Sequence, residues 1–184
     1  MLLDRLSRRM AVITLWLVIL MLTLNAAYWL FPQSASALEG FGLAFSLSDR
    51  LISSLQLDIG NFPWWQRLGA ILLSSFPLLA LSFGLLSLRA LFKSYAAGEY
   101  FSDSSAAHME RLGRAVVLWV ALSFLCEPAL SAWATMRLPA GRRLISLSFD
   151  SSGVVATFLA ACVLVIARIL RRASEINAEN QHFV

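Results

Sequence analysis

Four long apolar runs constrain the fold of this chain more than any other feature. They cover residues 10–31, 68–88, 115–134 and 154–170. A helix needs about 20 apolar residues to cross a hydrocarbon core about 30 Å thick, and about 17 residues is the lower limit. The runs therefore predict an all-α membrane protein with four transmembrane helices.

The remaining residues are too few for a second domain. Hydrophobic residues make up 59% of the 184 residues, above the roughly 45–50% of soluble proteins. No connecting segment is long enough to form a soluble domain, so residues 1–184 are predicted to form a single integral membrane domain.

The segment Ala35-Ser36-Ala37 after the first run resembles a signal-peptide cleavage site. The first run exceeds the roughly 7–15 apolar residues of a signal peptide, so we expect it to be kept as a helix. Cleavage would leave three spans.

The basic residues orient the four helices. Ten of the 15 lysines and arginines lie in the two tails and the segment between the second and third runs, which share one side of the membrane. Such an excess marks the cytoplasmic side, so both termini are expected on the cytoplasmic side of the membrane. Arg137, Arg142 and Arg143 oppose this bias. Basic residues that flank spans do not predict direct nucleic-acid binding.

Two segments on the opposite side alternate apolar with polar residues. They cover residues 42–48 and 144–149, and the overlapping stretches 45–49 and 146–150 resemble each other. Period-two alternation is typical of strands, so a small outer β element is expected; chance similarity is the alternative.

The second and third runs are predicted to extend into the cytoplasm as a helical hairpin. Gly98 fits the position just after a helix, and Ser102 fits an N-cap followed by the favourable charge of Asp103. The last helix is expected to continue to about Glu179. The helix ends form a candidate partner surface, with solvated ends as the alternative. Its residues are Tyr95, Gly98, Glu99, Phe101 and Arg111.

Glu127 is the only charged residue well inside a run, and Pro128 follows it. An intramembrane carboxylate is costly and suggests a function. Polar residues of the other runs that could join it are Thr23, Asn25, Ser74, Ser75 and Thr157. We select Glu127, Asn25, Ser74 and Thr157 as a candidate intramembrane polar site. It would hold a proton or cation, or its glutamate would only fix helix packing.

No motif for catalysis, cofactor binding or metal binding occurs in the chain. His108 and His182 lack metal-ligand spacing. Cys126 and Cys162 lie within runs at similar depth, where small buried thiols are the first expectation and a disulfide is the alternative. No catalytic residue, cofactor or metal is therefore expected, and the chain is not predicted to be an enzyme.

Residues 88–102 read Leu-Arg-Ala-Leu-Phe-Lys-Ser-Tyr-Ala-Ala-Gly-Glu-Tyr-Phe-Ser, and Arg111-Leu112-Gly113-Arg114 follow. With an Ile-Ser-Leu segment at residues 145–147 and a terminal valine, this pattern resembles bacterial domain-of-unknown-function family 2975. The resemblance covers roughly residues 68–184 and implies a four-span membrane protein without established activity. It also implies a helix-turn-helix regulator as partner, since members are often encoded beside one. The segment Gln181-His182-Phe183 departs from the more acidic tail of the family.

The sequence thus predicts a non-enzymatic binding or regulatory component that tethers or senses for a cytoplasmic helix-turn-helix regulator. The alternative is a transport or resistance component for small molecules that uses Glu127. The protein is expected to lie in the lipid bilayer. Assembly into a homo-oligomer is a further alternative.

Overall fold

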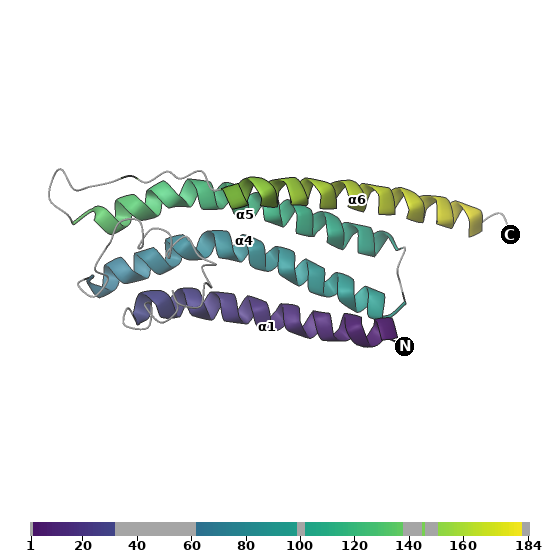
Figure 1. Cartoon of the computed structure of the whole chain (residues 1–184), viewed down its shortest axis with the longest axis horizontal. Coiled ribbons are helices and arrows are strands. Elements are labelled where there is room, and N and C mark those ends of the chain that lie inside the picture. Colours follow the sequence, from purple (N-terminus) through teal and green to yellow (C-terminus); the bar gives the residue numbers. More distant parts are fainter. Residues whose placement is uncertain (1, 32–61, 99–101, 138–144, 146–150, 182–184) are drawn as a thin grey trace. The chain divides into compact units, whose positions relative to one another are not determined.

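The computed structural model describes residues 2–31, 62–98, 102–137, 145 and 151–181. Its regular structure consists of helices α1 (Leu2–Leu30), α4 (Trp64–Ala96), α5 (Asp103–Thr135) and α6 (Ser151–Gln181) (Figure 1). Each helix is long and apolar enough to cross a membrane. The predicted all-α membrane protein with four transmembrane helices is therefore confirmed.

Each apolar run lies within one helix, apart from Phe31, which follows the last residue of α1. The predicted strand segments, residues 42–48 and 144–149, lie outside the described residues except for Ile145, which is not part of a strand. α6 ends at Gln181, two residues beyond the predicted Glu179. Pro77 and Pro128 both lie inside unbroken helices, so neither proline ends its helix.

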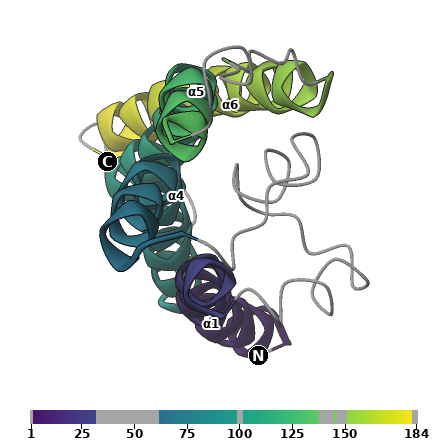
Figure 2. The same ribbon diagram turned by 90° about the vertical axis from the view of Figure 1, so that its left-hand side faces the viewer.

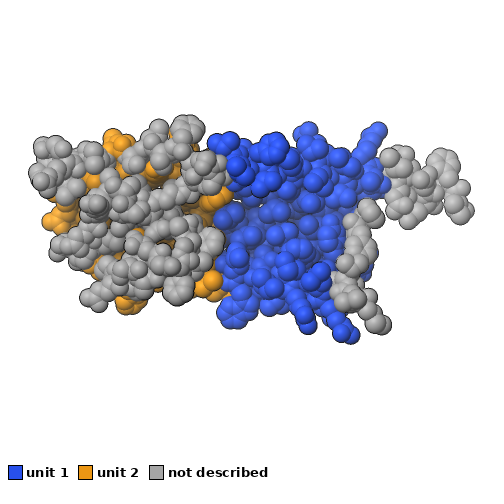
Figure 3. All heavy atoms as spheres, viewed as in Figure 1, with its two compact units in different colours: residues 1–18, 80–118, 151–184 blue, residues 19–79, 119–150 orange. Residues whose placement is uncertain are grey.

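The chain folds into two compact units (Figure 3). Unit 1 contains residues 1–18, 80–118 and 151–184, and unit 2 contains residues 19–79 and 119–150. Helices α1, α4 and α5 contribute to both units, whereas α6 belongs to unit 1. The expectation of a single integral membrane domain stays a prediction.

The turn between α4 and α5 follows the local sequence signals. The Ala97 N–H donates to the Lys93 carbonyl over 3.1 Å, and Gly98 then adopts a φ of 86°. Only glycine takes that left-handed conformation without steric cost. The Ser102 hydroxyl accepts the Ser105 N–H over 3.2 Å and caps α5. The predicted helix end and helix start are both confirmed.

A single stripe of α1 is buried. Its members are Ala11, Thr14, Val18, Met21, Asn25, Tyr28 and Trp29. Successive members are three or four residues apart, and both Tyr28 and Trp29 follow Asn25 at this spacing, so they lie on one face of the helix. The other faces expose large apolar side chains such as Trp16 and Leu20, as expected for a helix that lipid surrounds.

Unit 2 has a hydrophobic core made from three helices. Tyr28 and Trp29 of α1, Ala70 of α4 and Leu130 of α5 are buried at its centre. Tyr28 and Trp29 meet edge to face, with ring centroids 6.3 Å apart. The end of α1 is thereby held in the core of unit 2 by two aromatic side chains.

Unit 1 packs its neighbouring helices at small residues. A Cβ on Gly84 of α4 would lie 2.8 Å from the Ala115 Cβ of α5. A Cβ on Gly113 of α5 would lie 2.8 Å from Leu164 of α6. Within this unit, α4 lies between α1 and α5, and α6 lies beside α5 (Figure 2). Close helix contact at glycine is typical of packing in membranes.

Candidate functional site

Three of the four candidate intramembrane residues lie in unit 2 and are buried. Asn25 of α1 is 3% exposed, Ser74 of α4 is 1% exposed, and Glu127 of α5 is 6% exposed. A polar group buried among membrane helices must find a partner there, because lipid offers none. Unit 2 therefore holds buried polar side chains on each of its three helices.

Asn25 connects α1 to α4 through a serine. Its Nδ2 atom donates to the Ser75 Oγ over 3.2 Å, and the Ser75 hydroxyl donates to the Ile71 carbonyl over 2.6 Å. Ser74 donates to the same carbonyl over 3.2 Å. The hydrogen bond between α1 and α4 thus uses Ser75, a residue we considered but did not select.

Glu127 begins a buried polar row on α5. Ser131 and Thr135 follow at intervals of four residues and are 0% and 1% exposed, so all three share one helix face. The Ser131 hydroxyl donates to the Pro128 carbonyl over 3.0 Å, and the Thr135 hydroxyl donates to the Ser131 carbonyl over 2.8 Å. The four-residue spacing was the sequence signal for Ser131 and Thr135, and we overlooked it.

Thr157 is placed differently from the other three candidates. It lies on α6 in unit 1 and is exposed. Its hydroxyl donates to the Gly153 carbonyl one turn earlier, over 2.9 Å. The structure therefore brings Asn25, Ser74 and Glu127 into one unit and leaves Thr157 in the other.

A reciprocal pair of hydrogen bonds fastens the start of α4 to the end of α5. The Gln66 Nε2 donates to the Trp133 carbonyl over 3.2 Å and to the Ala134 carbonyl over 3.1 Å. The Trp133 Nε1 donates back to the Gln66 carbonyl over 3.0 Å. Gln66 is 1% exposed. The last carbonyls of α5, which have no partner within a helix, are satisfied in this way.

Trp133 fits because glycine faces it. A Cβ on Gly69 would lie 2.4 Å from two carbons of the Trp133 ring. On the same side, the Trp65 and Trp133 rings meet edge to face at 5.9 Å. Sequence reasoning assigned no partner to Trp133. It therefore missed the contact between Trp133 and the start of α4.

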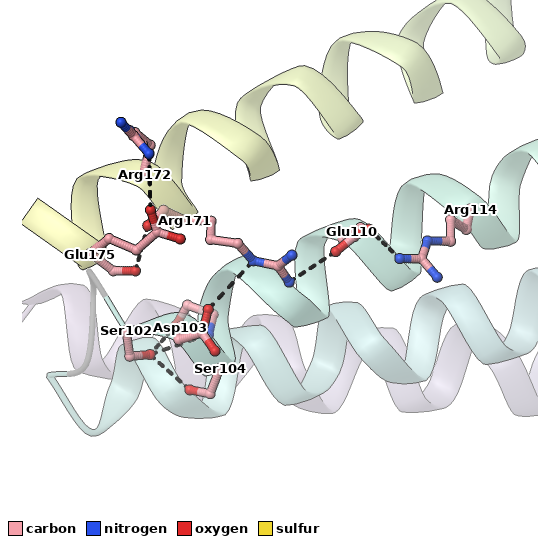
Figure 4. Close-up of polar contacts among 10 residues, drawn as sticks. Ser102, Asp103, Ser104, Glu110, Arg114, Arg171, Arg172 and Glu175 are labelled. Atoms are coloured by element: carbon pink, nitrogen blue, oxygen red, sulfur yellow. Dashed lines mark hydrogen bonds and ion pairs between the residues drawn. The ribbon is translucent and has the colours of Figure 1, made fainter.

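An arginine of α6 bridges two acidic residues of α5 in unit 1. The Arg171 Nη2 lies 3.1 Å from the Glu110 Oε2, and its Nε lies 3.5 Å from the Asp103 Oδ1 (Figure 4). Arg114 pairs with the other Glu110 oxygen. These side chains lie at the polar end of unit 1, by which we mean residues 89–98, 102–114 and 168–175. The contacts attach the polar part of α6 to the first turns of α5.

The candidate partner surface belongs to the same polar end. Tyr95 lies in the last turns of α4, the exposed Gly98 follows that helix, and Arg111 is exposed on α5. Glu99 and Phe101 lie outside the described residues. Three of the five predicted residues are thus placed in unit 1.

Two nitrogen atoms near this surface are buried without a hydrogen-bond partner in the described part of the chain. They are the Arg89 Nε on α4 and the His108 Nδ1 on α5. Buried polar atoms of proteins usually have a protein or water partner.

Within the described ranges, no group of three or more histidine, cysteine, aspartate or glutamate side chains could hold a metal ion. Cys126 and Cys162 are free thiols. The disulfide alternative is therefore not realised in this structure.

Comparison with known proteins gives one match. A family model described as "Protein of unknown function (DUF2975)" matches residues 26–184. No curated protein and no solved structure matches the chain.

Proposed function

The chain belongs to the DUF2975 family, and we propose that it is a non-enzymatic membrane component that binds a cytoplasmic helix-turn-helix regulator. The polar end of unit 1 would be the binding surface. This end and both termini would lie on the cytoplasmic side of a bacterial inner membrane. The excess of basic residues at this end supports that orientation.

One observation carries the proposal: Arg171 holds α6 to α5 beyond the apolar runs. Its guanidinium contacts carboxylates of α5 at residues 103 and 110. Helix ends that are connected to each other lose less conformational entropy when a partner binds. The surface is therefore preorganised for docking.

The tip of the α4–α5 hairpin provides the side chains that would contact the regulator. Tyr95 provides an aromatic ring with a polar hydroxyl, which is frequent in binding hot spots. Arg111 provides an exposed guanidinium for an acidic group of the regulator. A regulator held in this way would stay near the membrane and away from its operator until it is released.

The test is site-specific photo-crosslinking of the full-length protein in its native membrane. A photoreactive residue at position 95 or 111 is expected to crosslink a helix-turn-helix protein, whereas the same residue at Phe83, an exposed apolar position of α4, is not. Deleting the gene is expected to change transcription of the targets of that regulator. Equal crosslinking at all three positions, or unchanged transcription, would overturn the proposal.

A second candidate function rests on the buried carboxylate of Glu127. We propose as the alternative that this residue carries a proton or cation during transport of a small molecule. Its burial beside the hydroxyls of Ser131 and Thr135 on the same face of α5 supports this reading. Such a row offers oxygen atoms at successive helical turns.

Proteoliposomes that contain a pH-sensitive dye test the alternative. A Glu127→Gln variant keeps the shape of the side chain but cannot ionise, so proton flux driven by a gradient is expected to be lost. Glu127→Asp is the matched control that keeps the carboxylate. Equal flux for wild type and E127Q, with equal thermal stability, would reject the transport function.

A further inference from the structure

Arginines of α5 and α6 surround a single carboxylate in unit 1. Arg114 and Arg171 both contact Glu110, and Arg168 also acts electrostatically on that carboxylate. Figure 4 shows Arg114 and Arg171 directed toward Glu110 from two sides. Together with Asp103, two carboxylates face three guanidinium groups, so positive charge is in excess.

The guanidinium groups are accessible. The side chains of Arg114 and Arg171 are 68% and 44% exposed, and Arg168 is exposed as well. Arg168 makes no ion pair within the described residues. The contacts with Glu110 do not use all the N–H donors of these arginines, so each guanidinium group can also bind an additional anion.

Their position along the helices coincides with the ends of two apolar runs. Arg114 directly precedes the run of residues 115–134, and Arg168 lies near the end of the run of residues 154–170. Exposed apolar side chains adjoin both arginines: Val117 and Leu118 on α5, and Val165, Ile166 and Ile169 on α6. Positive charge beside exposed apolar surface matches a phospholipid, which carries a phosphate next to acyl chains.

Close packing fixes this geometry. Gly113 allows α6 to approach α5, because a Cβ there would lie 2.8 Å from Leu164 and 3.3 Å from the Ala160 carbonyl. Arg114 on α5 and Arg168 on α6 flank this contact in sequence. Arginine suits phosphate because its planar donors can bind two oxygens at once.

We propose that Arg114, Arg168 and Arg171 form a binding site for the phosphate of an anionic phospholipid at the α5–α6 contact of unit 1. The acyl chains would lie along the exposed apolar residues of α6. Glu110 would compete with the phosphate for these arginines. The site shares Arg171 with the surface proposed for the regulator, but Arg114 and Arg168 are specific to the lipid site, and Tyr95 and Arg111 are specific to the regulator.

Binding of phosphatidylglycerol to the full-length protein in phosphatidylcholine nanodiscs tests this proposal, with native mass spectrometry as the readout. Replacing the three arginines by glutamine is expected to lower the affinity by about a hundredfold, since each basic residue near an anionic lipid contributes a factor of about five. Arg168→Gln alone should give part of this loss, and it leaves both ion pairs of Glu110 intact.

The matched control replaces Arg5, Arg8 and Arg9 of α1, which removes the same charge from the same unit. This control is expected to keep the affinity within about twofold, because a local site and not net charge binds the lipid. Glu110→Gln is expected to raise the affinity by removing a competitor. Equal losses for both triple variants, or a loss in E110Q, would overturn the proposal. Displacement of the lipid by inorganic phosphate at equal concentration would also overturn it, since the site would then serve free phosphate.

Discussion

Gln66 and Trp133 hydrogen-bond to each other's backbone carbonyl groups, although 67 residues separate them. The Gln66 side chain donates to the Trp133 carbonyl over 3.2 Å, and the Trp133 indole donates to the Gln66 carbonyl over 3.0 Å. The pair connects the first turn of α4 with the last turns of α5 in unit 2. The Gln66 side chain thereby satisfies carbonyl groups at the end of α5 that have no partner within the helix.

Replacing Gln66 by leucine tests the strength of this connection. The variant loses the bonds to the Trp133 and Ala134 carbonyls, and hydrogen bonds between membrane helices contribute about 0.6 kcal/mol on average and up to about 1.7 kcal/mol. A loss of about 1–2 kcal/mol in the free energy of unfolding is expected, measured by thermal or denaturant unfolding in detergent. Trp133→Phe, which keeps much of the ring but removes the donor, and the double variant complete a mutant cycle. Additive effects of the two changes would show that the pair is not coupled.

Gly69→Ala is expected to destabilise unit 2 by overpacking. The added Cβ would lie 2.4 Å from the Trp133 ring, and core overpacking typically costs about 1–3 kcal/mol. Unfolding in detergent measures the loss. Trp133→Leu in the same chain should make room for the methyl group, so the alanine should cost less in that background than in the wild type. An equal cost in both backgrounds would contradict the contact.

Gly98→Ala is expected to destabilise the turn after α4 for a different reason. No atom lies within 4 Å of a Cβ at this position, so the added methyl group meets no neighbour. The φ of 86° is costly for alanine, by about 1–2 kcal/mol. Asparagine tolerates this conformation better, so Gly98→Asn should cost less than Gly98→Ala. The order of the melting temperatures, wild type above G98N above G98A, is the check, and equal values for G98N and G98A would argue against backbone strain.

Arg171→Gln is expected to loosen the polar part of α6. The variant loses the contacts with Asp103 and Glu110 of α5, so hydrogen exchange near residue 171 should become faster. The difference from wild type should shrink in high salt, because screening already weakens exposed ion pairs.

Arg172→Gln is the matched control for this change. Arg172 pairs only with Glu175 of the same helix among the described residues, so its loss should leave the contact between α5 and α6 unchanged. If both variants accelerated exchange equally, Arg171 would have no special role in holding α6.

The local signals in the sequence were sufficient for the helices and for the turn between α4 and α5. Apolar runs of membrane length require helices, since a helix satisfies its own backbone hydrogen bonds in lipid. Gly98 and Ser102 act on the backbone within a few residues of themselves. Features of this kind can be predicted from sequence because the interacting groups are also neighbours in the chain.

The candidate intramembrane site was only partly predictable, because its residues are far apart in the chain. The buried positions of Asn25 and Glu127 fit the rule that polar groups in spans face protein. The choice of Ser75 and not Ser74 as the partner of Asn25 depends on how far each helix is rotated about its axis, which an apolar run does not encode.

The sequence by itself determined that this chain forms four membrane helices, where the α4–α5 turn lies, and which family the pattern resembles. Only the tertiary structure decided that Gln66 meets Trp133, that Gly113 admits α6, and that Arg171 bridges to Asp103 and Glu110. These contacts join residues far apart in the chain. They depend on the rotation and close approach of whole helices, and many rotations are compatible with the same hydrophobic run.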